Sequence, residues 1–429
     1  MGWSTSKIHK KNISINLKNN KQNNLIDYIL VLILIAVTGI PFFYFAIENI
    51  IIAFIVAFVV ALFRGFKFNF EIVTILLLFI IVDILQSIIF KYFSITTTLG
   101  SILRISLAFL VLGLCGIKFT KYFTNIIYYF AIVSFVFFIP CILSSDFYYM
   151  LKELGIRFFQ APFNPDTGIY KITPNIILFT VHPVIVEGAR NPGPFWEPGG
   201  FGIFLVIALM FNLIDKKRIF SKQNVILLIA ILSTLSTATY LSTIVLILFF
   251  LLHNKILKFR YLYSFMLTLL ALFLIFNLDF LSEKIEKNID DAYTSTSSRF
   301  GSAVQDLNEF WLSPLVGVGK GYSIRTYRDI SLWHRNNGLT GLLKTYGIIF
   351  FIYYFYLYYN GLRNYCIYKK FNSSFAFFGL IIFLILGFSQ SIFLRPFFFS
   401  LLFLGGVIKK EFQTISHNYE KNINYNPNT

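Results

Sequence analysis

The stretch RNPGPFWEPGGFGIFLVIALMFNLI, residues 190–214, joins a rigid charged segment directly to an apolar run. Its three prolines and four glycines restrict the backbone and let it approach a ligand closely. Arg190 and Glu197 place charges at the mouth of the helix predicted from residue 201 onward, where ionisable groups of membrane proteins are commonly functional. The stretch therefore predicts a membrane helix with a polar site at its entrance. A connecting or re-entrant loop is the alternative.

The composition of the whole chain supports this assignment. Of the 429 residues, 57% are hydrophobic, only 13% are charged and 53 are phenylalanine, a balance that excludes an ordinary soluble domain. The formal charge of +17 comes from lysines and arginines that lie mostly in short segments between apolar runs. That distribution is typical of cytoplasmic loops and of contact with anionic membrane lipid, and it argues against nucleic acid as a partner. The fold class predicted is an all-α polytopic membrane protein.

Apolar segments predict about twelve transmembrane helices. With a cytoplasmic N-terminus, the basic connectors fall inside the cell, and Lys91 and Arg395 are the exceptions on the outer face. The predicted spans lie near 25–41, 47–63, 70–90, 98–116, 122–143, 201–214, 223–236, 239–253, 261–280, 337–359, 373–389 and 396–408.

The same count divides the chain into regions. Both termini are expected in the cytoplasm, and two long loops are expected on the outer face, where polar residues gather. The regions are a cytoplasmic tail (1–24), a five-helix region (25–143), the first outer loop (144–200), central helices (201–280), the second outer loop (281–336), C-terminal helices (337–408) and a cytoplasmic tail (409–429).

A cluster of hydroxyl side chains interrupts the apolar run 223–253. Residues 233–239 read STLSTAT, which we interpret as an outward turn between two short helices. The alternative is one long kinked helix whose hydroxyls bond back to its own backbone.

Arg190 and Glu197 are the first candidates for chemistry. A guanidinium keeps its charge and offers a planar fork that suits phosphate oxygens, although an arginine at this depth can also bind lipid headgroups. Glu197 precedes a predicted helix start, so its carboxylate is a candidate catalytic group, a cap for free amides, or a partner of Arg190. Trp196 is placed to stack on a sugar ring or to anchor the loop at the membrane interface.

The second outer loop supplies further candidates. Arg299 follows Ser298 and is either a second phosphate ligand or part of a solvated face. The glycine-rich segment 314–321 lacks the Gly-Lys-Ser/Thr ending of a phosphate-binding loop, so no nucleotide site is predicted. His334 closes the loop at a helix mouth, where an imidazole can take up and release a proton at neutral pH, although a lone histidine is usually structural.

Two charges are predicted inside the bilayer. Asp83 and Arg104 lie at similar depths in consecutive antiparallel spans, and unpaired charges there are costly. We expect either an Asp83–Arg104 ion pair or a polar cavity that leads to the outer site. The three cysteines lie in or beside apolar runs without metal-ligand spacing, and neither loop has an acidic cluster that resembles a metal site. A metal site and a disulfide framework are therefore not expected.

Taken in order, these motifs resemble the bacterial O-antigen polymerase and O-antigen ligase superfamily. The resemblance covers residues 185–360, and the earlier helices match only in being hydrophobic. Two departures occur: Thr237-Ala238 stands where a Ser-Arg pair is frequent, and an arginine separates the His and Asn of the last motif. The matching segments are Arg-x-x-Gly-x-Phe-x-Glu-Pro-Gly at 190–199, the Ser/Thr-rich turn at 233–239, Ser-Arg-Phe-Gly at 298–301, Pro-Leu-x-Gly-x-Gly at 314–319 and His-x-Asn-x-x-Leu at 334–339.

The resemblance implies a glycan transferase of the inner membrane that works on the periplasmic face and uses an oligosaccharide linked to undecaprenyl diphosphate. Arg190 would bind the diphosphate and Arg299 would assist, while His334 would orient or deprotonate the acceptor hydroxyl or contact the leaving diphosphate. Arg335 and Asn336, beside this histidine, are further substrate-binding candidates. No cofactor or metal is expected, and a chain-length regulator is a further partner that the resemblance allows.

The acceptor distinguishes the two branches of this superfamily. A polymerase extends another lipid-linked repeat unit, whereas a ligase transfers glycan to a lipid A core sugar. The long first loop (144–200) and the Trp-Glu-Pro-Gly segment are closer to the polymerase branch. A flippase for the same lipid-linked glycan is an alternative from another class, but the chain shows no internal symmetry and no paired broken helices in two halves.

Overall fold

The computed structural model describes residues 24–44, 46–66, 70–159, 174–253, 298–326 and 335–413. Within these ranges the chain folds into helices with short connectors, and its β structure is limited to one isolated bridge between Asn175 and Thr180. The predicted all-α class is therefore confirmed for the described chain. The predicted span 261–280, both ends of the chain and His334 lie outside the described residues.

The helices follow the predicted apolar runs closely. A helix lies at every predicted span within the described residues, because long apolar runs bury their faces as helices. In chain order the helices are Asn24–Gly39, α2 (Pro41–Tyr44), α3 (Ile47–Phe63), α4 (Phe70–Phe90), α5 (Ile95–Cys115), α6 (Lys118–Leu143), α7 (Ser145–Phe158), α8 (Val184–Gly188), α9 (Pro198–Lys216), α10 (Lys222–Ser233), α11 (Thr237–His253), α14 (Arg299–Phe310), α15 (Tyr322–Thr326), α16 (Gly338–Tyr368), α17 (Phe375–Ser389), α18 (Pro396–Leu402) and a last helix over 404–413.

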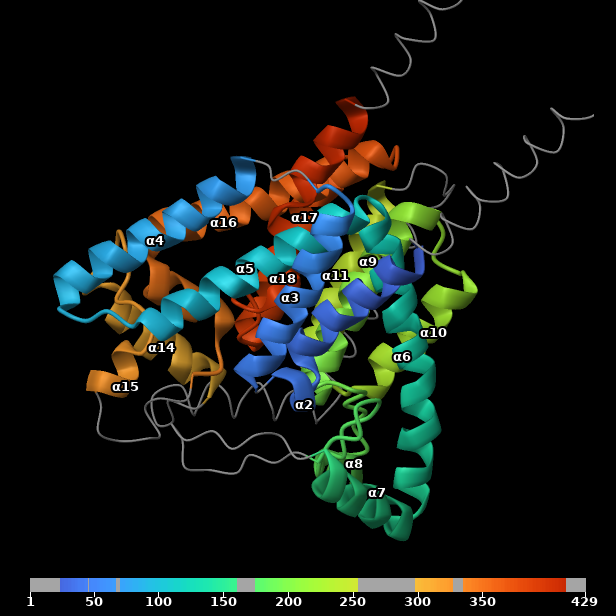
Figure 1. Ribbon diagram of the computed structural model, residues 1–429. Coiled ribbons are helices and arrows are strands. Elements are labelled where there is room, and N and C mark those ends of the chain that lie inside the picture. The colour runs from blue at the N-terminus through green and yellow to red at the C-terminus, as the bar shows by residue number, and fades with distance from the viewer. Residues whose placement is uncertain are drawn as a thin grey trace, which may run out of the picture.

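Five of the described helices are long and apolar enough to cross a membrane: α4, α5, α6, α9 and α16. The remaining apolar helices are shorter, and α10, with 12 residues, is about 18 Å long against a hydrocarbon core of about 30 Å. The protein is thus an all-α membrane protein, and the count of twelve spans stays a prediction. Figure 1 shows the two helix pairs between predicted spans, α7 with α8 and α14 with α15, toward the lower side of the view.

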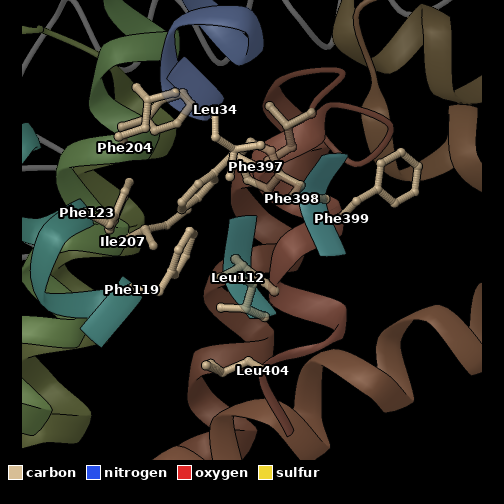
Figure 2. Close-up of a cluster of buried hydrophobic side chains, with 14 of the residues drawn as sticks. Leu34, Leu112, Phe119, Phe123, Phe204, Ile207, Phe397, Phe398, Phe399 and Leu404 are labelled. Carbon is tan, nitrogen blue, oxygen red and sulfur yellow. The ribbon is translucent and has the colours of Figure 1, made fainter. Parts of the chain in front are cut away.

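The helix α9 forms the centre of the bundle. Every residue from Pro198 to Ile214 is buried, because α6, α10, α11 and α17 pack around it. Figure 2 shows aromatic side chains from α6 and α18 meeting α9. Phe397 stacks on Phe123 with ring centroids 4.4 Å apart and lies 5.4 Å from Phe204. This core fixes the N-terminal end of α9, where the sequence places its polar site.

The helix α16 is broken at Gly347, whose φ of 73° lies in the left-handed region that glycine tolerates. The glycine-rich loop 314–321 packs against the break. There the amides of Val318 and Gly319 donate to the carbonyls of Lys344 and Thr345 at 2.8 and 3.2 Å. The loop thus satisfies backbone groups that the broken helix cannot, as buried non-helical backbone in a membrane protein requires.

The turn predicted within 233–239 is confirmed. The helix α10 ends at Ser233 and α11 begins at Thr237, so the alternative of one continuous kinked helix is wrong. Leu235, within the turn, has a positive φ of 45°. The break turns the backbone carbonyls of residues 233 and 234 toward the loop that precedes α9.

Candidate functional site

The loop before α9 is held rigidly against three helices. The buried side chain of Asn191 donates to Ser134 Oγ on α6 at 3.0 Å and to Ser233 Oγ at the end of α10 at 3.1 Å. Phe195 is fully buried and stacks on Phe204 of α9 with ring centroids 4.2 Å apart. These contacts fix the positions of the three predicted site residues of this loop.

Glu197 is bound by a residue that the sequence did not indicate. It is the N-cap residue of α9, but its side chain makes no capping hydrogen bond, and no ion pair with Arg190 is present among the described residues. The predicted capping and pairing roles are therefore both wrong. Gln390, at the end of α17, donates to Glu197 Oε1 and accepts from Trp196 Nε1 at 3.3 Å. One amide thus holds the carboxylate and the indole together.

Arg190 and Arg299 are anchored in the same manner. Arg190 Nε donates to the carbonyl of Thr234 at 3.3 Å, and Arg299 Nε donates to the carbonyl of Ser389 at 2.9 Å. Both guanidinium groups are half-buried, and neither has a further hydrogen bond in the part of the chain that the structure describes. Each arginine is therefore fixed by Nε on the end of a helix, which leaves its two terminal nitrogens for a ligand.

Predicted site residues from the two outer loops interact electrostatically. Burial lowers the pKa of Arg190, the carboxylate of Glu197 raises it, and the positive charge of Arg299 lowers it again. The hydrogen bonds give the same grouping, because Arg299 is held by the carbonyl of Ser389 and the next residue, Gln390, holds Glu197. Residues separated by a hundred positions in the sequence thus lie near one another, and two guanidinium groups with one carboxylate give an excess of positive charge that favours an anion.

Arg395 is a further member of this site. Its guanidinium lies over the rings of Trp196 and Tyr44, 3.7 and 4.2 Å from their centroids, and its Nη1 donates to the carbonyl of Thr38 at 3.0 Å. Burial lowers its pKa. Arg395 thus occupies one face of Trp196, which restricts the predicted stacking of that indole on a sugar. The sequence signal that could have identified Arg395 is its positive charge on the predicted outer face, where the positive-inside pattern places few basic residues.

Arg335 is bound in a buried ionic network. Its Nη2 lies 3.1 Å from Glu309 Oε1 and its Nε lies 3.5 Å from Asp306 Oδ1. Lys344 Nζ completes the network at 2.8 Å from Glu309 Oε2 and 3.1 Å from Asp306 Oδ1. Burial raises the pKa of Asp306, and the charge of Lys344 opposes this shift. The network joins α14 to the start of α16, so Arg335 is partly structural and not simply the substrate ligand predicted.

The residues beside Arg335 close this end of the site. The backbone amide of Asn336 donates to Ser302 Oγ at 3.1 Å, which holds this predicted ligand against α14. Asn337 caps α16, since its Oδ1 accepts from the amides of residues 339 and 340, and its Nδ2 donates to the carbonyl of Arg299 at 3.4 Å. His334 lies outside the described residues, and its catalytic role stays a prediction.

A second polar pocket lies between α4, α5 and the loop 314–321. Asp83 lines it and accepts a hydrogen bond from Thr98 Oγ1 at 2.7 Å. Within the described ranges no ion pair joins Asp83 to Arg104, so the predicted pair is wrong. Asp83 lines a polar pocket instead, and a connection from this pocket to the outer site stays a prediction. Lys320 enters this pocket from the loop.

The environment of Lys320 disfavours its charge. Its ammonium donates to Ser101 Oγ and lies 5.7 Å from the ring centroids of Phe79 and Tyr346. Desolvation lowers the pKa of Lys320 from 10.5 to about 7; the charge of Arg104 lowers it as well, and Asp83 acts in the opposite direction. Burial in this polar pocket thus lowers the pKa of a loop lysine to about 7.

Stability is expected to rise with pH between about 7 and 10.5 because of Lys320. In this window the unfolded chain keeps a proton that the folded chain has released, so raising the pH favours the folded state. Below about pH 7 both states carry the proton and the contribution is constant. Lys320→Met is expected to remove this rise in Tm, whereas Lys222→Met, at an exposed position on α10, keeps it. Identical slopes for wild type and Lys320→Met would contradict the desolvation.

No group of three or more His, Cys, Asp or Glu side chains that could hold a metal occurs in the described parts of the chain, and metal independence stays a prediction. No protein-family model matches the chain, and no curated protein matches it either. The features that bear on function are therefore the sequence motifs and the geometry of Arg190, Glu197 and Arg299.

Proposed function

We propose that this protein is a polysaccharide polymerase of the O-antigen or capsular type. It transfers oligosaccharide repeat units from undecaprenyl diphosphate onto the next lipid-linked unit, at the outer face of the inner membrane. The order of motifs in residues 185–360 supports this proposal, and so does the membrane-protein architecture. The substrates would be the lipid-linked oligosaccharides, with membrane lipid around them.

The observation that carries the proposal is the convergence of Arg190 and Arg299. Both are fixed through Nε on backbone carbonyls at helix ends, and both Arg299 and the carboxylate of Glu197 act electrostatically on Arg190. Two planar forks with a net positive charge suit the oxygens of a diphosphate better than a neutral ligand or a cation.

The chemistry requires a group that leaves with negative charge. An acceptor hydroxyl attacks the anomeric carbon of the donor, the bond from that carbon to the diphosphate oxygen breaks, and the electron pair stays on the diphosphate. Arg190 and Arg299 stabilise this charge in a site partly shielded from water, where such interactions are strong. The hydroxyl proton passes to a base, for which His334 and Glu197 are the candidates.

The test is the ladder of surface glycan in cells that lack the protein, complemented with wild type, Arg190→Ala or His334→Ala at matched expression. Single repeat units without a ladder in the deletion strain, restored by wild type and by neither variant, are expected. Arg218→Ala, which removes an exposed arginine from a predicted cytoplasmic connector, is expected to restore the ladder and serves as the control.

Other outcomes of this experiment distinguish the alternatives. Bare core without any repeat unit would point to the ligase, and repeat units trapped on the inner face would point to a flippase. A full ladder with both variants would mean that this site has no part in transfer.

A further inference from the structure

A cavity of about 240 Å³ lies beside the proposed diphosphate site. Its walls come from the glycine-rich loop, the start of α16 and the connector between α17 and α18. We call it the α16 cavity, and its lining residues include Tyr322, Arg335, Asn337, Gly341, Lys344 and Ser391.

Arg335 lines this cavity and has unpaired donors. Its side chain is only 8% exposed, and its enclosed Nη1 has no hydrogen-bond partner among the described residues. Buried polar nitrogens of native proteins nearly always have a partner, so the guanidinium can still donate to an acceptor oxygen of a ligand or of an ordered water at the cavity.

The charge around the cavity selects a neutral ligand. The positive charges of Arg335 and Lys344 are matched by the two carboxylates of Asp306 and Glu309, all within 3.5 Å of a partner in the network. An anion would therefore lose its hydration without gaining a net opposite charge. The desolvation cost of a neutral, oxygen-rich group is lower than that of an anion, and such a group can still accept hydrogen bonds from the residues that line the cavity. At the proposed diphosphate site, by contrast, the two positive charges of Arg190 and Arg299 exceed the single negative charge of Glu197.

Size and surface point to the same class of ligand. Pockets for drug-sized molecules span about 300–1,000 Å³, so a cavity of about 240 Å³ holds one ring of an oligosaccharide and not a whole repeat unit. Tyr322 and Phe393 line it together with Asn337 and Ser391. Aromatic rings pack on the apolar face of a sugar while the polar groups bind its hydroxyls.

We infer that the α16 cavity binds a neutral sugar ring of the acceptor glycan. The connector at the end of α17 joins the two sites, since the carbonyl of Ser389 holds Arg299, the amide of Gln390 holds Glu197, and Ser391 lines the cavity. A sugar bound there would present its hydroxyl beside the donor diphosphate. The assignment of this sugar to the acceptor rests on the proposed polymerase function.

The test uses the full chain in a zwitterionic detergent, because a maltoside headgroup would itself compete as a sugar. The probes are methyl glycosides of glucose, galactose and N-acetylglucosamine, followed by saturation-transfer NMR, and inorganic pyrophosphate, followed by the shift in Tm. Gly341→Leu adds a side chain to the α16 wall of the cavity, where an added Cβ would lie 3.7 Å from Asp306 Oδ2, an ordinary van der Waals contact. Ser391→Phe fills it from the opposite wall, at an exposed position outside any helix.

At least one glycoside is expected to bind wild type, and both filled variants are expected to lose it while they keep the response to pyrophosphate. That retained response also shows that they are folded. The inference is overturned if no glycoside binds wild type, if both variants keep glycoside binding, or if filling the cavity abolishes the pyrophosphate response instead. A failure of pyrophosphate to bind wild type, with glycoside binding blocked by both variants, would remove the proposed function and leave the sugar site standing.

Discussion

Replacing Arg299 by alanine is expected to slow glycan transfer about 10²–10³-fold with a much smaller change in KM, as for removal of one donor that stabilises charge in a transition state. Under the proposed function, negative charge grows on the leaving diphosphate as the glycosidic bond breaks, and Arg299, held on Ser389 through Nε, keeps its two terminal nitrogens for that charge. The measurement is the turnover of a lipid-linked repeat unit by purified protein in lipid vesicles.

Arg299→Lys separates charge from geometry. Lysine restores a positive charge, but it cannot hold the carbonyl of Ser389 through Nε and offer two more parallel donors at the same time. Recovery is therefore expected to be partial, with Arg218→Ala at the wild-type rate as the control. Full recovery by lysine would mean that only charge matters, and a wild-type rate for Arg299→Ala would remove this arginine from the site.

Much of the helical fold was predictable because it follows from local composition. Long apolar runs bounded by charged connectors specify helices with little dependence on the rest of the chain. The hydroxyl-rich segment 233–239 interrupts the apolar run 223–253 and so predicted the turn between α10 and α11. The grouping of Arg190, Glu197 and Arg299 was also predictable, since all three lie beside the ends of helices on segments expected at one face.

The contacts inside the site were not predictable in the same way. Gln390 and Arg395 are single polar residues after an apolar run, and only packing brings them to Glu197 and Trp196. The same holds for Lys320. It reaches the polar pocket from a loop, whereas the depths of Asp83 and Arg104 in their predicted spans indicated only those two residues there. Such partners depend on tertiary structure, and no spacing in the sequence encodes them.

The buried ionic network also has a signal in the sequence. Asp306 and Glu309 lie three residues apart, so they share one face of α14, and Lys344 is a lone charge in a predicted span. A charge within a span requires a partner, and a pair of carboxylates on an amphipathic helix offers one. Considering the two features together would have predicted the buried network from sequence.

Lys344→Met is expected to lower the free energy of unfolding by about 3–5 kcal/mol, because it leaves two buried carboxylates with one arginine. Both carboxylate side chains are at most 1% exposed and that of Lys344 is 10% exposed, so water cannot take the place of the lost ammonium. The measurement is denaturation of the purified protein in mixed micelles. The control is Lys369→Met, whose ion pair with Asp215 is 26% and 32% exposed and is expected to contribute about 0–1 kcal/mol.

The double variant Lys344→Met with Glu309→Met tests whether charge imbalance is the cause. It leaves Arg335 opposite Asp306 alone, so it is expected to recover much of the lost stability despite losing a second ionic contact. If Lys344→Met costs no more than Lys369→Met, or if the double variant is worse than the single one, the network is not desolvated as its geometry indicates. Because the network fastens α14 to α16, and α14 begins with Arg299, its loss is also expected to slow transfer through displacement of that arginine.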